Sequence, residues 1–138
     1  MTFFTTYLSA QSHALRLPED SREDTERFVR QHQKGVITAE RAPFNRQLDL
    51  WAFSIATAIA QGSGPLDDPS SQWGRRFVTT KDVQMPDDLC DLLAVIAMDH
   101  LGIDHPKVDD PAEIIEIANR FAGAGCPTVI KNLKDPDL

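Results

Sequence analysis

The chain has 138 residues, of which 41% are hydrophobic and 25% are charged, and its formal net charge is −7. A chain of this length forms one domain and buries about two-thirds of its surface on folding. Its ordinary apolar fraction excludes the fibrous and fully disordered classes. An evenly acidic protein is repelled by phosphate backbones and anionic lipids, which disfavours nucleic-acid and membrane-surface roles unless basic residues gather locally.

The beginning of the chain and its cysteines bear on compartment and cofactors. Residues 1–7 lack the basic segment, long apolar core and cleavage site of a secretory signal, so we expect a cytoplasmic protein. Cys90 and Cys126 belong to no Cys-x-x-Cys pair. This removes support for a zinc knuckle or a dithiol redox site and predicts two buried thiols. We expect no cofactor.

The first third of the chain predicts one peripheral helix. The apolar residues of segment 1–17 fit neither the helical nor the strand period, so a short helix and an extended arm both remain open. A helix then begins near Pro18, with acidic residues in its first turns that complement the helix dipole, and ends before Gly35. Only Phe28 and Val29 are large apolar residues in its interior, which is typical of a helix on the outside.

A strongly apolar helix is expected between Pro43 and Gly62. Its apolar residues recur at steps of three and four, which defines one helical face, and further apolar residues cover much of the other side. A helix that is apolar on most sides is normally surrounded by others, so we expect this one to be the central element. The residues of the first face are Phe44, Leu48, Trp51, Ile55 and Ile59.

Segment 62–85 has no clear period, because glycine and proline residues interrupt it repeatedly. The β-branched residues between Arg75 and Val83 nevertheless predict a short strand or an extended segment. An irregular segment of this length in a compact domain is usually mobile or functional.

Two further helices are defined by their ends. The third begins at Pro86 and ends at Gly102, and the fourth runs from its cap at Asp110 to Gly123. Apolar residues after the fourth helix are expected to dock on the core, and residues 134–138 are expected to form a flexible tail.

These patterns together predict a mainly α, single domain over residues 1–138. The expected architecture is a compact bundle of four to five helices with a long irregular loop at about 62–85 and a short strand. Two helices that are apolar on nearly all sides also leave room for a homodimer that buries the excess apolar surface.

The negative charge is concentrated in one segment. Residues 82–116 hold ten acidic residues and one basic residue, a net of −9, so the rest of the chain is slightly positive. Many of these carboxylates begin helices, where they complement the dipole. They also form a candidate face for a basic partner protein, or a face that mimics nucleic acid. The candidate partner-binding residues are Asp87, Asp88, Asp91, Asp109, Asp110 and Glu113.

The sequence also offers two weaker candidates, a metal site and a nucleic-acid site. His100, Asp104 and His105 are residue types that bind divalent metals, although their spacing matches no established zinc or iron pattern. Trp73, Arg75 and Arg76 combine aromatic and guanidinium groups, as single-stranded nucleic acid or a phosphate-bearing ligand requires. No nucleophile, paired carboxylates or phosphate loop indicates catalysis, so we expect a protein that is not an enzyme.

One resemblance gives a biological setting. The segment from Ala42-Pro43-Phe44 through Leu48 to Ala56, with the alanine- and glycine-rich segment from Ile117 to Gly125, resembles small accessory proteins of bacterial DNA phosphorothioation (Dnd-type) and related anti-phage defence systems. The resemblance implies an accessory or adaptor role in defence against foreign DNA, with a larger protein as partner. It implies no catalytic residue.

Overall fold

The computed structural model describes residues 3–30, 42–67 and 74–135. In these residues the two strands form an antiparallel sheet and the remaining elements are helices, which confirms the mainly α fold and the short strand within segment 62–85. In chain order the elements are α1 (Phe3–Ser9), β1 (Ala14–Pro18), the 3-10 helix η1 (Glu19–Ser21), α2 (Arg22–Phe28), α3 (Gln47–Ala60), β2 (Gly74–Thr79), α4 (Asp87–Leu101) and α5 (Pro111–Lys134).

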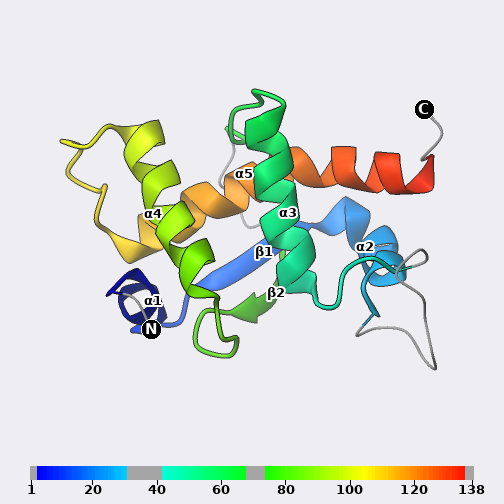
Figure 1. Cartoon of the computed structure of the whole chain (residues 1–138), viewed down its shortest axis with the longest axis horizontal. Helices are drawn as coiled ribbons and strands as arrows, with labels where there is room; N and C mark the ends of the chain where they lie inside the picture. Colours follow the sequence, from blue (N-terminus) through cyan, green and yellow to red (C-terminus); the bar gives the residue numbers. More distant parts are fainter. Residues whose placement is uncertain (1–2, 31–41, 68–73, 136–138) are drawn as a thin grey trace.

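The central element is α5. It contacts α1, α3, α4 and β1, and Figure 1 shows it running across the molecule behind α3 and α4. The prediction that α3 is surrounded by other elements is wrong, because only one side of α3 packs on α5. On its other side, 53% of Phe53 and 44% of Ile59 are exposed to solvent.

Helix α5 does not end at Gly123, as predicted, but continues unbroken to Lys134. The physical reason lies two residues further on, where α3 and α5 cross. A Cβ atom at Gly125 would overlap the carbonyl group of Ser54 and lie 3.1 Å from the backbone nitrogen of Ala58. Glycine therefore lets the two backbones touch, and this tertiary packing overrides its weak helix propensity.

The expected docking of the segment after Gly123 is confirmed, but as the second half of a helix. Val129 and Ile130 are buried on its inner side. Lys134, which we expected to begin the flexible tail, is the last residue of α5, and its Nζ lies 2.9 Å from a carboxylate oxygen of Asp24. Residues 136–138 lie outside the described residues.

A buried asparagine joins the sheet to the helices. Asn119 on α5 is 1% exposed, and its Oδ1 accepts hydrogen bonds from the Arg16 backbone N–H at 2.8 Å and from Trp51 Nε1 at 3.1 Å. Its Nδ2 donates to the Ala14 carbonyl at 2.9 Å. One side chain thus fixes β1, α3 and α5 relative to one another.

Helix α2 is shorter than predicted. It ends at Phe28, and Val29 is extended and forms a parallel bridge with Phe44. The Phe44 N–H donates to the Phe28 carbonyl at 3.3 Å. The predicted continuation of the helix is therefore wrong at Val29, because burial of this β-branched side chain in the core favours extended pairing. Residues 31–41 lie outside the described part of the chain.

The alternatives left open for residues 1–17 are resolved from residue 3 onward. A short helix, α1, is followed by β1, and Figure 1 shows α1 beside the first turns of α4. No helix in the described ranges combines the length and hydropathy that crossing a bilayer requires.

Candidate functional surfaces

Helix α1 links the two groups of predicted acidic residues. The buried hydroxyl of Thr5 donates to Oδ1 of Asp87 at 2.6 Å, at the start of α4. The hydroxyl of Tyr7 donates to the backbone carbonyl of Asp109, just before α5. Two segments separated by about 20 residues of chain are therefore held at one end of the molecule (Figure 1). We call the six predicted carboxylates together with α1 the acidic end.

The six carboxylates differ in what they do locally. Asp87 accepts the hydrogen bond from Thr5, and Asp110 Oδ1 accepts from the Ala112 N–H at 3.0 Å as the cap of α5. Asp88 and Asp109 are exposed. Asp110 therefore has the capping role that the helix-start interpretation predicts, and Asp87 holds α1. Asp88 and Asp109 present charge to solvent.

The outward side of α4 adds apolar groups to the acidic end. Asp88, Leu92, Val95 and Asp99 follow one another at helical spacing, and all four are exposed. Leu92 is 42% exposed and Val95 is 58% exposed. This stripe has two apolar side chains between two carboxylates, a pattern that matches a partner with apolar and basic groups.

The titration of Tyr7 tests the geometry of the acidic end. Burial raises the pKa of Tyr7, and the charges of Asp109 and Asp110 raise it further. The neutral hydroxyl is the form that donates to Asp109. The stabilisation is therefore complete below the ordinary tyrosine pKa of about 10, and it is lost as pH rises through the higher pKa of the folded state.

Tyr7 is the only tyrosine in the chain, so tyrosinate absorbance reports this group directly. We expect its titration midpoint to lie above that of the chain unfolded in denaturant, and Asp109→Asn to lower the midpoint. A midpoint equal to that of the unfolded chain would contradict the placement of α1 beside Asp109.

The predicted arginine pair does not form one patch. Arg75 lies opposite the buried Leu17, and Arg76 lies opposite Arg16, so successive side chains of β2 point to opposite faces of the sheet. Arg75 is partly buried, its Nη2 donates to Oε1 of Gln47 at 2.9 Å, and burial lowers its pKa. Arg76 is exposed.

Of the three residues predicted for nucleic acid, the structure therefore leaves one on the surface and uses one as a contact to α3. The third, Trp73, lies outside the described residues. The short strand predicted between Arg75 and Val83 already includes both arginines, and its period of two places adjacent side chains on opposite faces.

The predicted metal-binding residues lie near the end of α4. His100 is exposed and its ring packs edge-on against Phe121 at a centroid distance of 6.0 Å. Nδ1 of His105 accepts a hydrogen bond from the Lys107 N–H at 3.0 Å. In the part of the chain that the structure describes, no three His, Cys, Asp or Glu side chains, Asp104 included, come together to hold a metal.

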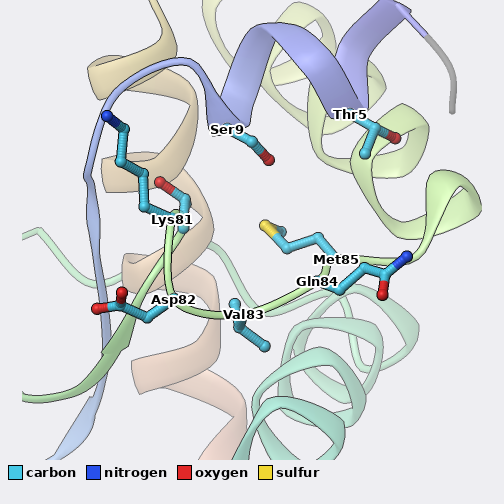
Figure 2. A pocket seen from close by; sticks show the side chains of 8 residues that line it. Thr5, Ser9, Lys81, Asp82, Val83, Gln84 and Met85 are labelled. Atoms are coloured by element: carbon cyan, nitrogen blue, oxygen red, sulfur yellow. The ribbon is translucent and has the colours of Figure 1, made fainter.

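A hollow of about 340 Å³ lies between α1 and the connection from β2 to α4. Figure 2 shows Ser9 and Met85 directed toward this space, whereas the polar ends of Asp82 and Gln84 point away from it. The carboxylate of Asp82 accepts a hydrogen bond from Thr79 Oγ1 at the end of β2, at 2.9 Å. The charged groups around the hollow therefore diverge and give it no convergent acid, base or nucleophile.

A second hollow, of about 330 Å³, is apolar and lies between α3 and the end of α5. Phe44, Phe53, Val129 and Leu133 are among its lining residues. It continues the open side of α3, a helix that we expected other elements to surround. The sequence feature that could have indicated an open apolar side is the near absence of charge on α3, whose only charged residue is Asp49.

Comparisons with known proteins give no relative for this chain. No family model, curated protein or solved structure matches it.

Proposed function

We propose that the protein is an adaptor that binds a basic segment of a larger protein through its acidic end. The observation that carries the proposal is the pair of hydrogen bonds from Thr5 to Asp87 and from Tyr7 to Asp109, which join both acidic groups to α1. The resemblance to accessory proteins of DNA phosphorothioation and anti-phage defence supports such a system as the setting of the partner. The proposed role is binding rather than catalysis.

The physical basis is the net charge of −9 over residues 82–116. Charge of one sign on one surface steers a partner of the opposite sign and makes association depend on salt. The exposed Leu92 and Val95 would contact apolar side chains of the partner once charge has oriented it. The proposed partner segment is therefore an amphipathic helix with Lys or Arg residues beside a short apolar stripe.

The first test uses two variants that each remove two negative charges. Asp88→Asn/Asp109→Asn changes exposed carboxylates of the acidic end, and Glu23→Gln/Asp67→Asn changes exposed carboxylates elsewhere. Binding is measured by fluorescence anisotropy to a synthetic amphipathic peptide rich in lysine. We expect about tenfold weaker binding for the first variant, near wild-type binding for the second, and loss of binding at high salt. Equal affinities for the two variants would refute the acidic end as the binding surface.

The second test identifies the partner. The wild type and both variants are used as bait in an extract of the native host at low salt. We expect a larger protein that is retained by the wild type and by the Glu23/Asp67 variant but lost with the Asp88/Asp109 variant. If no protein shows this pattern, the adaptor proposal fails.

A further inference from the structure

We infer that the open side of α3 is the interface of a homodimer in which two copies of α3 pack antiparallel across a two-fold axis at Ala56. This inference goes beyond the proposed function, because it concerns another surface and another partner. It rests on the composition of that surface, on its symmetry and on the apolar hollow beside it.

From Ala52 to Ala60 the open side of α3 is apolar except for the partly exposed Thr57, and Asp49 continues this side toward the start of the helix. Ser54 and Ala58 face α5 at the helix crossing, so the residues half a turn away face outward. Ala56, Ile59 and Ala60 are exposed, Phe53 is exposed as well, and Ala52 is partly exposed. In Figure 1, α3 lies in front of α5, and no other described helix or strand lies in front of it. Solvent-facing helix sides normally carry polar and charged residues.

The outward residues are arranged symmetrically about Ala56. Ala52 and Ala60 are each four residues away, and Phe53 and Ile59 are each three residues away. A two-fold axis at Ala56 places Phe53 of one copy against Ala60 of the other, and Ile59 against Ala52. Each large side chain therefore meets a small one, which is the packing that allows two helices to approach closely.

The few charges on α3 do not oppose a second copy as the occupant of this surface. The only charged side chain of α3 is Asp49, and it pairs with Arg46 at 3.4 Å. The antiparallel pairing therefore brings no like charges together on α3. The outward stripe of α4 behaves differently, because self-pairing would set the carboxylates of Asp88 and Asp99 against each other.

The apolar hollow extends the same surface. Phe53 lies on its boundary with the open side of α3, and the hollow also has Phe44 and Leu133 in its wall. Its volume of about 330 Å³ exceeds that of a single apolar side chain, so side chains of the second copy that flank its α3 can enter it.

Disulfide trapping tests the register of the pair. The two native cysteines are buried, and burial raises the pKa of both thiols, so they react slowly. In the full chain we compare Ala56→Cys with Ala112→Cys, because both replace an exposed alanine on a helix. Under mild oxidation we expect a covalent dimer from Ala56→Cys, whose Cβ atoms face each other across the axis, and little from Ala112→Cys. Equal yields from the two variants would overturn the inference.

Sedimentation equilibrium tests the dimer without new covalent bonds. We expect the wild type to associate reversibly, and Ala56→Glu to dimerise at least about tenfold more weakly because two carboxylates then meet at the axis. Ala112→Glu adds the same charge elsewhere and should dimerise like the wild type. A wild type that stays monomeric across a hundredfold range of concentration would overturn the inference, as would equal dimerisation of the two glutamate variants.

The effect of salt separates this inference from the proposed function. Each copy has a net charge of −7, so salt screens the repulsion between copies and should preserve or strengthen the dimer. Added salt should instead weaken the binding of a basic partner at the acidic end. Each proposal can therefore fail while the other holds.

Discussion

Replacing Gly125 with alanine is expected to destabilise the protein by at least about 2 kcal/mol, although alanine is the better helix former by about 1 kcal/mol. The added Cβ would overlap the Ser54 carbonyl group and press on the backbone of Ala58. These are backbone atoms, so relief requires α3 and α5 to move apart along their whole contact. Because α3 packs on the core through this crossing, the substitution also weakens the packing of neighbouring side chains between α3 and α5.

Urea unfolding followed by circular dichroism measures the change in the free energy of unfolding. The control is Gly64→Ala, because Gly64 is exposed and an added Cβ there meets nothing within 4 Å. We expect the free energy of unfolding of the control to lie within about 0.5 kcal/mol of the wild-type value. A Gly125→Ala protein as stable as the wild type would show that the two helices do not cross at this glycine.

Asn119→Leu is expected to lower the free energy of unfolding by about 3–5 kcal/mol. Leucine fills a similar volume, but it leaves the Arg16 N–H, the Ala14 carbonyl and Trp51 Nε1 without their bonds to Asn119. An unsatisfied buried donor or acceptor costs about 1–3 kcal/mol, so the loss of three partners outweighs the gain from burying apolar atoms. Urea unfolding measures this loss, and the exposed Asn45→Leu serves as the control.

A second substitution distinguishes hydrogen bonding from packing. Asn119→Asp keeps the acceptor for Arg16 and Trp51 but removes the donor to Ala14 and adds a buried charge. The folded state then favours the protonated carboxyl group, which can donate to Ala14 again. We therefore expect the deficit of this variant relative to the wild type to shrink as pH falls through the raised pKa of the buried carboxyl group toward the ordinary aspartate pKa of about 4. A deficit that does not change with pH would argue against this network.

Local sequence patterns predicted the helices well where the ends carried strong stop and start residues. Pro86 and Gly102 bound α4 as expected, and Asp110 caps α5. Prediction failed where tertiary packing overrode local preference. Gly123 and Gly125 suggest a helix end in isolation, whereas in the fold Gly125 is the position at which the Ser54 carbonyl approaches the backbone of α5.

The acidic end could be predicted from the sequence only in part, because its charges are local and the contacts that join them are not. The sequence located the acidic segment because charge can be counted along the chain, but it offered no indication that Thr5 and Tyr7 would join its two halves. The role of Asn119 was equally hidden, because a single polar residue on an apolar helix face has no local pattern. The pairing of Arg75 with Arg76 as one site failed because adjacent strand residues face opposite sides.

The hydrogen bonds of Asn119 also have a consequence for association through the sheet. Its amide group accepts from the N–H of Arg16 and donates to the carbonyl of Ala14, which is what a neighbouring strand would do at this point. The outer edge of β1 is therefore already occupied by a helix side chain. Strand addition by another chain is blocked there, so a sheet of only two strands gains on one side the protection that larger sheets obtain from a covering strand or loop.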